Sequence, residues 1–247
     1  MPAIIAAPSA ASHVTDLLNP KQLAEYLQLS QRTVYRLLER GGIPAVKVGG
    51  QWRFRRTAVD EWLDVNMQRL DADSLSALQH DGDSGPEQRH IAQLIGPENA
   101  RILVPAGSRD DVVRAFISQV HFPEVVSVAV VVERILERER LCSTALTDGV
   151  ALLHTPRSRP RVLATHDLVA IGRIDAPVDF GALDGRATDT LILLLARSER
   201  DQIALLAKVA RLCREPGFLV ALHDARGPVG VTTLIRRTED RVFARFR

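Results

Sequence analysis

The stretch Asn19–Leu38 reads NPKQLAEYLQLSQRTVYRLL and contains two short segments with helical spacing of apolar residues. It opens on an asparagine suited to the N-cap of a helix and a proline suited to the first helical position. A second helix is expected to start after Ser30 and to end at the Gly41-Gly42 pair. Two such helices in succession predict a helix-turn-helix unit. The apolar stripe of the first helix consists of Leu23, Ala24 and Leu27.

A tight hairpin is expected to follow the two helices. The segments Val46–Val48 and Gln51–Phe54 alternate apolar and polar residues on either side of Gly49-Gly50, and glycine tolerates the positive φ of such a turn. The run Thr57–Asp60 resembles a capping box ahead of a third helix that contains Trp62. Residues 17–68 therefore predict a small α+β domain, a winged helix-turn-helix.

Positive charge is concentrated in this predicted domain. Seven of the eight charged residues between Gln31 and Arg56 are Lys or Arg. Arg and Gln side chains pair with guanine and adenine edges in the major groove, and Lys and Arg bind phosphates. Double-stranded DNA is the expected partner; an ordinary helical domain with a solvated basic face is the alternative. The expected base-reading residues are Gln31, Arg32, Thr33 and Arg36, and the expected phosphate contacts are Lys47, Arg53, Arg55 and Arg56.

The rest of the chain differs in composition and indicates a second domain. Residues 1–16 predict a flexible tail, and the polar, acid-rich residues 69–90 predict a linker. Residues 91–240 show apolar runs with strand and helix spacing, which favours an α/β domain whose sheet is covered by helices. The expected helices are Ser108–Val120, Val125–Arg138 and Arg200–Cys213, and the expected strands are Val150–Leu153, Val162–Ile171 and Thr190–Ala196.

Composition and spacing argue against several classes of protein. Cys142 and Cys213 lie far apart in apolar surroundings and are expected to be free thiols in a reducing compartment. No His or Cys pair has the spacing of a zinc site, so we expect neither a metal nor a cofactor. The N-terminus lacks the basic region of a signal peptide, and no apolar run reaches the ~20 residues of a membrane span. We expect a cytoplasmic protein that does not cross a membrane.

Of the seven histidines, His154 occupies a position suited to a reactive group. His154 ends the apolar run Gly149–Leu153, and a strand end holds a side chain at the edge of a sheet. A neutral imidazole there can attack a phosphoryl group if its other nitrogen is held by a hydrogen bond. A purely structural histidine is the alternative. His13, His80 and His90 are expected in the polar tail or linker, and His121, His166 and His223 as ordinary surface or core side chains.

The first domain contains a Ser-x-x-Thr-Val-Tyr pattern, an Ile-Pro pair, a Gly turn and an aromatic-basic strand. These features resemble the helix-turn-helix domains of the excisionase and MerR-like family from about Leu17 to Leu63. The resemblance implies a small winged helix that often works in pairs on DNA, so we expect a homodimer. The matching residues are Ala24, Leu27, Ser30, Thr33, Val34, Tyr35, Ile43, Pro44, Gly49 and Trp52–Arg55.

Five segments of the second domain also form a pattern: Leu136–Glu139, Ser143-Thr144, Gly149–His154, Pro177–Phe180 and Thr190–Ala196. Together they resemble the enzyme IIA domains of the fructose, mannitol and nitrogen-regulatory phosphotransferase systems. The resemblance implies that His154 is a phosphoacceptor, that Arg138 lies near the phosphoryl group, and that a phosphocarrier protein is a partner.

Two positions depart from the enzyme IIA pattern. Leu153 stands where the family has proline, and Gln202 stands where many members have a second active-site histidine. A glutamine can donate a hydrogen bond to a phosphoryl oxygen, but it carries no positive charge. The basic run Thr155–Arg161, which includes Arg157, either supplies compensating charge or forms a surface loop.

The two parts together predict a transcriptional regulator in which phosphorylation of His154 changes the binding of an operator. Two alternatives stay open. The chain is a phosphotransferase component that passes phosphate to a partner, or a DNA-binding protein whose enzyme IIA-like domain docks to other proteins without being phosphorylated. Whether the chain is an enzyme therefore depends on the fate of the phosphoryl group.

Overall fold

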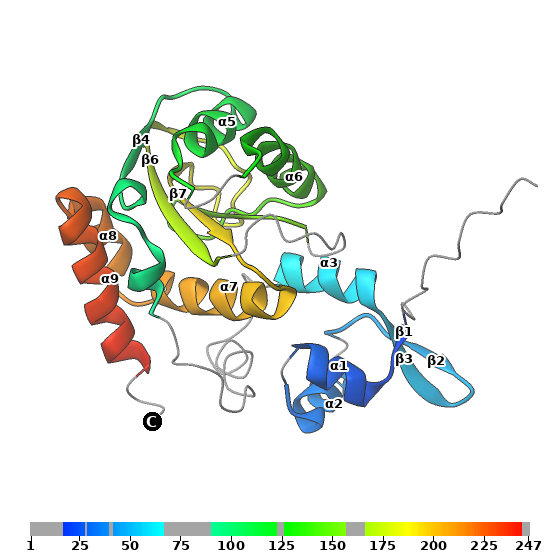
Figure 1. Ribbon diagram of the computed structural model, residues 1–247. Coiled ribbons are helices and arrows are strands. Elements are labelled where there is room, and N and C mark those ends of the chain that lie inside the picture. The colour runs from blue at the N-terminus through cyan, green and yellow to red at the C-terminus, as the bar shows by residue number, and fades with distance from the viewer. Residues whose placement is uncertain are drawn as a thin grey trace, which may run out of the picture.

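The computed structural model describes residues 17–27, 29–39, 42–66, 90–122, 126–156 and 166–243. It contains a small N-terminal unit and a larger sheet domain (Figure 1). The expected tail, residues 1–16, and all of the expected linker 69–90 except its last residue lie outside the described residues. Within the described part of the chain, no helix is both long and apolar enough to cross a membrane.

The N-terminal unit begins with the two predicted helices, α1 (Pro20–Leu27) and α2 (Gln31–Glu39). A reciprocal pair of hydrogen bonds starts α1: the amide of Gln22 donates to Asn19 Oδ1, and the amide of Asn19 donates to Gln22 Oε1, both at 2.9 Å. This capping box satisfies two of the free N–H groups at the helix start. The predicted helix-turn-helix and its N-cap are therefore confirmed.

The predicted hairpin also forms, with β2 (Val46–Val48) antiparallel to β3 (Gln51–Arg55). A short strand that was not predicted, β1 (Leu17–Leu18), pairs with the other edge of β3, so the sheet order is β1-β3-β2. The helix α3 (Arg56–Asn66) follows β3 directly. The prediction that the run from Thr57 caps this helix is wrong, because Thr57 already lies inside its first turn.

The helices α1 and α3 are held together by a polar contact as well as by apolar packing. Tyr26 Oη in α1 donates a hydrogen bond of 2.5 Å to Asp60 Oδ1 in α3, and Asp60 is only 3% exposed. The guanidinium of Arg56 lies 4.7 Å from the centre of the Tyr26 ring. These contacts tie the last helix of the unit to the first.

The sheet domain has four strands in the order β4 (Ile102–Val104), β6 (Leu168–Val178), β7 (Thr188–Leu195) and β5 (Val150–His154). β4 runs parallel to β6 and β5 runs parallel to β7, whereas β6 and β7 are antiparallel. The predicted α/β class is confirmed. The strand expected over Val162–Ile171 begins at Leu168 and extends to Val178, and residues 162–165 of the expected range lie outside the described part.

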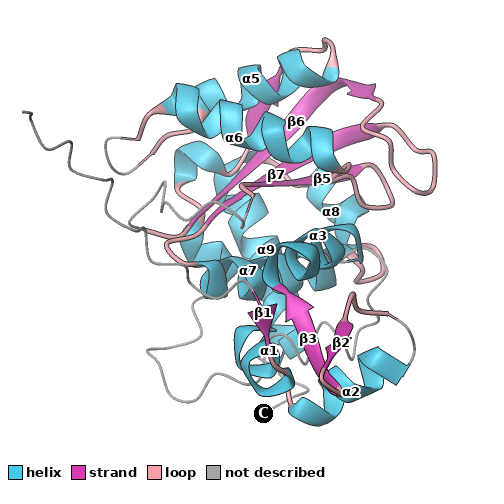
Figure 2. Ribbon diagram, turned by 90° about the vertical axis from the view of Figure 1, so that its right-hand side faces the viewer, coloured by secondary structure: helices cyan, strands magenta, loops and turns pink. Residues whose placement is uncertain are grey.

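Helices cover both faces of this sheet (Figures 1 and 2). The helices α5 (Arg109–Gln119) and α6 (Val128–Leu141) lie on one face, and α7 (Glu199–Cys213), α8 (Phe218–Asp224) and α9 (Gly227–Phe243) lie on the other. The strand β7 contributes side chains to the apolar cores on both faces: Leu191 and Leu193 pack under α5 and α6, while Ile192 and Leu194 pack under α7. The sheet is therefore buried on both sides, as an apolar run without polar alternation predicts.

The contact between α5 and the sheet is close at one glycine. A Cβ atom on Gly172 of β6 would lie 2.7 Å from two ring carbons of Phe116 in α5. Any side chain at position 172 would displace the Phe116 ring, so this glycine sets the distance between α5 and the sheet.

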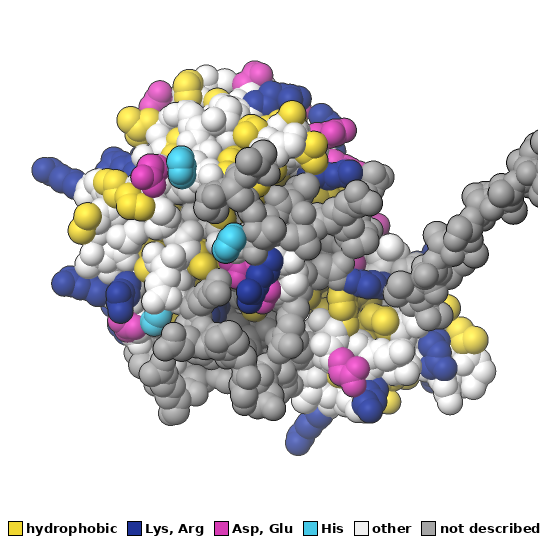
Figure 3. Space-filling model, viewed as in Figure 1, with side chains coloured by type: hydrophobic (Ala, Val, Ile, Leu, Met, Phe, Trp, Pro, Cys, Tyr) yellow, Lys and Arg dark blue, Asp and Glu magenta, His cyan; other side chains and the backbone are white. Residues whose placement is uncertain are grey.

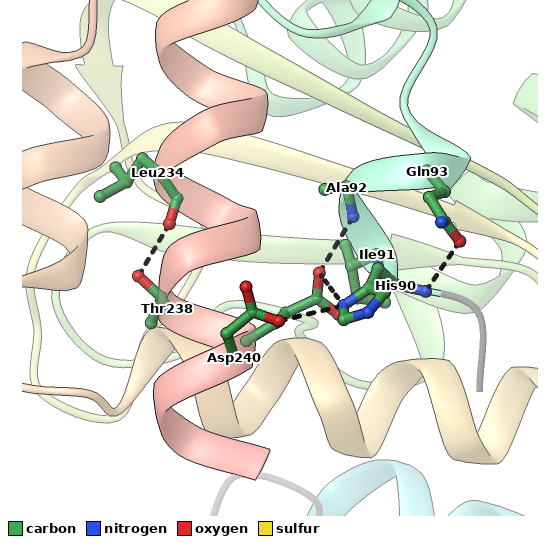
Figure 4. Close-up of polar contacts among 8 residues, drawn as sticks. His90, Ile91, Ala92, Gln93, Leu234, Thr238 and Asp240 are labelled. Carbon is green, nitrogen blue, oxygen red and sulfur yellow. Dashed lines mark hydrogen bonds and ion pairs between the residues drawn. The ribbon is translucent and has the colours of Figure 1, made fainter. Parts of the chain in front are cut away.

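The expected linker ends earlier than predicted, because His90 is part of the sheet domain (Figure 4). Glu239 in α9 is 1% exposed and accepts hydrogen bonds from the amides of Ile91 at 2.7 Å and Ala92 at 3.2 Å. The Nδ1 atom of His90 lies 3.7 Å from Glu239 Oε2 and 3.9 Å from Asp240 Oδ1. A buried carboxylate on the last helix thus anchors the first residues of the domain, and the assignment of His90 to the linker is wrong.

Candidate functional site

His154 is the last residue of β5, and it is 5% exposed. Its Nδ1 atom lies 2.8 Å from the carbonyl oxygen of Leu152. A carbonyl oxygen can only accept a hydrogen bond, so this contact places the proton on Nδ1 and leaves the lone pair on Nε2. The backbone of β5 therefore fixes the tautomer in which Nε2 is the unprotonated nitrogen.

Arg138 in the last turn of α6 faces that Nε2 atom. The side chain is 1% exposed; its Nε donates to His154 Nε2 at 3.2 Å, and its Nη1 donates to the carbonyl of Cys142 at 2.8 Å. Because Nε2 of His154 accepts from Arg138, it carries no proton in the structure. Arginine also offers the forked donors that match phosphoryl oxygens. The site therefore combines a neutral nucleophile with a cation suited to an incoming phosphoryl group.

A chain of hydrogen bonds supports the backbone of the site. Glu139 is 3% exposed and accepts hydrogen bonds from the amide of Thr144 at 3.2 Å and from its hydroxyl at 2.6 Å. The carbonyl of Thr144 accepts from the amide of Leu152 at 3.0 Å, and the carbonyl of Leu152 is the one that holds His154. Glu139 and Thr144 were not predicted as site residues, although their position next to Arg138 and within the Ser-Thr pair was a usable signal.

Gln202 lies in the first turns of α7, which Ser198 caps through a hydrogen bond from the amide of Asp201. It is 6% exposed, and its Nε2 donates to the carbonyl oxygen of Thr155 at 2.8 Å. Gln202 therefore binds the residue that follows His154. Its amide is therefore a hydrogen-bond donor that points at the end of β5.

The structure brings the predicted site residues together to different degrees. His154 and Arg138 are in direct contact. Gln202 instead donates to the backbone carbonyl of Thr155, the residue that follows His154. Arg157 lies outside the described residues. Leu153 is fully buried under α5 and α6 and pairs with Leu193 of β7, so this departure from the family's proline is a normal strand residue here.

The predicted base-reading residues lie along α2. Gln31, Arg32 and Arg36 are exposed, whereas Val34 is fully buried and anchors the helix. Thr33 is half-buried; its amide donates to Ser30 Oγ at 3.1 Å, and its hydroxyl lies 2.9 Å from the same atom. Three of the four side chains therefore face solvent, and Thr33 contributes mainly to the start of the helix.

The predicted phosphate-binding residues of the hairpin are mostly braced by neighbours. The ammonium of Lys47 lies 4.7 Å from the Trp52 ring centre. Arg53 donates to the carbonyl of Trp52 at 2.9 Å and to Gln51 Oε1 at 2.8 Å. Contacts with rings and neutral oxygens orient a cation without neutralising it. The charges therefore remain at the surface, where Arg55 is also exposed and where Figure 3 shows several Lys and Arg side chains.

The described residues also bear on metal binding and on thiol chemistry. They contain no group of three or more His, Cys, Asp and Glu side chains that could hold a metal ion. Both cysteines are free thiols: Cys142 is half-buried, and burial raises the pKa of Cys213 to about 12, so this thiol stays protonated.

Comparison with known proteins assigns both parts of the chain. Residues 17–66 match the model of a helix-turn-helix domain, and residues 93–237 match the model of the phosphoenolpyruvate-dependent sugar phosphotransferase system, EIIA 2. The nitrogen regulatory protein of Pseudomonas aeruginosa is 30% identical over 126 residues, which cover 49% of this chain and 79% of that protein. That of Bradyrhizobium diazoefficiens is 28% identical over 147 residues, which cover 59% of this chain and 94% of that protein.

The fold agrees with these matches. The crystal structure of nitrogen regulatory protein IIA-Ntr from Neisseria meningitidis superposes with a TM-score of 0.52 at 22% identity, over 59% of this chain and 98% of that structure. The EIIA match alone spans more than half of the present chain. The chain is therefore a member of the EIIA type-2 family of the phosphoenolpyruvate-dependent sugar phosphotransferase system, with a helix-turn-helix domain at its N-terminal side.

Proposed function

We propose that this protein is a transcriptional regulator whose EIIA domain accepts a phosphoryl group on Nε2 of His154. The observation that carries the proposal is the pair of contacts on one imidazole: Leu152 holds Nδ1 at 2.8 Å and Arg138 faces Nε2 at 3.2 Å. The first contact fixes the nucleophilic atom, and the second supplies the charge that a phosphoryl group needs. The donor is a phosphorylated phosphocarrier protein.

The transfer is a simple displacement at phosphorus. The lone pair of Nε2 forms the new N–P bond, the bond between phosphorus and the carrier breaks, and the carrier group leaves with that electron pair. The Nδ1 proton stays in its hydrogen bond to Leu152. In the structure, before any transfer, Arg138 Nε donates to Nε2, the atom that must react. The guanidinium therefore turns from Nε2 to the phosphoryl oxygens during the step.

The regulator acts in the cytoplasm by binding double-stranded DNA. The exposed side chains Gln31, Arg32 and Arg36 of α2 enter the major groove, and the hairpin β2–β3 acts as the wing that contacts phosphates. Two copies bind as a homodimer, so that the paired α2 helices match two half-sites. Phosphorylation of His154 adds about two negative charges to the EIIA domain and changes the binding of DNA.

Labelling tests the mechanism directly. The full chain is incubated with labelled phosphoenolpyruvate, the general phosphotransferase enzyme and the phosphocarrier, and acid-labile phosphate is measured. Wild type is expected to take up label and His154→Ala is not. His223→Ala serves as the matched control because His223 is an exposed histidine on α8. An unlabelled wild type excludes the mechanism, and label that survives His154→Ala excludes the site.

A second candidate function is a docking domain that no longer accepts phosphate. The burial of His154, at 5% exposure, and the occupation of Nε2 by Arg138 favour it. The same experiment separates the two, because a docking domain binds the carrier in a titration but takes up no label. If label enters and then moves on to a third protein, the chain is instead a phosphotransferase component.

A further inference from the structure

We propose that α7 connects the His154 site to the helix-turn-helix unit, which docks on the outer face of this helix, and that phosphorylation loosens the docking. The docking itself is independent of the function proposed above, whereas its response to phosphorylation rests on that function.

The helix α7 is buried on more than one face. From Asp201 to Cys213 every side chain is buried or half-buried, although one face of a helix is enough to pack on a sheet. Ile203, Leu206 and Ala210 share one face of the helix and belong to the same apolar cluster as Ile192 and Leu194 of β7. At 3.6 residues per turn, Leu205 and Leu212 lie on the opposite side, yet they are only 7% and 1% exposed. A further layer must therefore cover α7 on the outside.

Two elements form that outer layer. The helix α9 covers one flank, where Arg211 Nη2 donates to the carbonyl of Val242 at 3.3 Å and where Glu239 interacts with Lys208. The helix α1 of the N-terminal unit also contacts α7. Figures 1 and 2 agree that this unit lies on the side of α7 away from the sheet, and in Figure 1 it lies below and to the right of the N-terminal end of the helix.

The apolar cores of the two domains merge at this contact. The buried side chains of α1, including Leu23 and Leu27, belong to the same cluster as Leu205, Val209 and Leu212 of α7. A continuous apolar cluster indicates a fixed contact between two domains, because separating them would expose apolar surface to water. Leu205 lies in the N-terminal half of α7, the half that is nearer to the N-terminal unit in Figure 1, and Leu212 lies two turns further along.

The same end of α7 is tied to the reaction site. Gln202 precedes Leu205 by three residues, so the two side chains lie on one side of the helix. Gln202 holds the carbonyl of Thr155, the residue next to His154. A phosphoryl group on Nε2 competes for the Gln202 amide, which releases Thr155 and shifts the first turn of α7. Leu205 moves with that turn, and the contact with α1 weakens.

Docking leaves the DNA-facing residues free. Gln31, Arg32 and Arg36 on α2 are exposed in the docked arrangement. The contact therefore sets the direction in which α2 points and does not block it. In a dimer, the direction of each α2 decides whether both helices reach their half-sites, so loss of docking weakens binding to a paired site.

Hydrogen exchange of the full chain tests the docking without any phosphorylation. Leu205→Ser is expected to increase exchange in α1 several-fold and to enlarge the radius of gyration. Leu212→Ser, on the same face but further from α1, is the matched control and is expected to leave α1 protected. Exchange in β7 shows whether the sheet domain is intact; if Leu205→Ser unfolds it, Leu205→Ala replaces that variant. Unchanged α1 exchange in a folded Leu205 variant overturns the docking.

The response to phosphorylation is measured on the wild type. After labelling by the phosphocarrier, α1 is expected to exchange faster, and binding to a paired DNA site is expected to weaken in wild type but not in Leu205→Ser. A labelled His154 with unchanged α1 exchange overturns the coupling. A wild type that takes up no label overturns the proposed function instead, and the docking result from Leu205→Ser still stands.

Discussion

The His154 site and the exposed face of α2 use the same kind of side chain in opposite surroundings. Arg138 is 1% exposed and donates to a histidine nitrogen and to a backbone carbonyl. Arg32 and Arg36 face solvent on a helix whose only fully buried side chain among those described is Val34. The first arginine is fixed before any ligand arrives, whereas the other two are free to adapt to a ligand. Burial, and not residue type, separates a positioned cation from a recognition surface here.

The largest expected effect is on the free energy of unfolding, when one arginine in each of the two regions is replaced by alanine. Arg138→Ala leaves a cavity and removes the donor from His154 Nε2 and from the Cys142 carbonyl, so we expect a loss of about 2–4 kcal/mol in the free energy of unfolding. Arg36→Ala should change stability by less than about 0.5 kcal/mol, because its side chain is exposed. Chemical denaturation measures both. Equal effects would remove the distinction between the two regions.

Much of the fold and part of the candidate site could be predicted from the sequence. The alternation of apolar runs predicted the α/β class, and two helically spaced segments ahead of a Gly-Gly hairpin predicted the helix-turn-helix. His154 could be predicted as a candidate phosphoacceptor because it ends an apolar strand and falls on a family motif. Arg138 came from the resemblance alone, since nothing in its local sequence shows that it reaches a residue 16 positions away.

The remaining parts depend on contacts that no local pattern contains. The helices α8 and α9 were not predicted, since Pro216-Gly217 and Gly227-Pro228 interrupt the apolar periodicity at their starts. His90 was assigned to the linker because its anchor, Glu239, is nearly 150 residues away. The partner of Gln202 is a backbone carbonyl, which every residue offers, so side-chain patterns could not identify it.

Next in size is the effect of two arginines on DNA binding. We expect Arg32→Ala on α2 to cost about 1–3 kcal/mol on the preferred site and to relax sequence preference. Arg55→Ala on β3 should weaken binding to all sequences and flatten the salt dependence. Titrations against a specific and a scrambled duplex at two salt concentrations separate the two patterns. If Arg55→Ala changed sequence preference and Arg32→Ala did not, the roles of α2 and the hairpin would be reversed.

A smaller effect is expected at the start of α1. Asn19→Ala removes the side-chain oxygen that accepts from the Gln22 amide at 2.9 Å, and should destabilise the N-terminal unit by about 1 kcal/mol. Both tryptophans, Trp52 and Trp62, lie in this unit, so denaturation followed by tryptophan fluorescence reports on it selectively. Far-ultraviolet circular dichroism, which is dominated by the larger sheet domain, should shift less. Equal shifts in both signals would indicate that the two domains unfold as one.

The smallest expected effect is a pH trend at the buried carboxylate of Glu239. Burial raises the pKa of Glu239 above its ordinary value of 4.5, although hydrogen bonds from the amides of Ile91 and Ala92 and the nearby charges of His90 and Lys208 act in the opposite direction. The folded protein thus holds this proton more tightly than the unfolded chain does. The contribution of Glu239 to stability is therefore present below pH 4.5 and is lost as the pH rises through its folded pKa.

Glu239→Gln removes this titration while keeping one oxygen that can accept from the amides. The free energy of unfolding of wild type relative to Glu239→Gln should therefore fall as the pH is raised, in urea denaturation series from about pH 4 to about pH 8. A relative stability of wild type that rises with pH would show that the amides and cations around Glu239 outweigh its burial. In that case Glu239 would be a buried charge held by backbone hydrogen bonds, as Arg138 beside His154 is held by the carbonyl of Cys142.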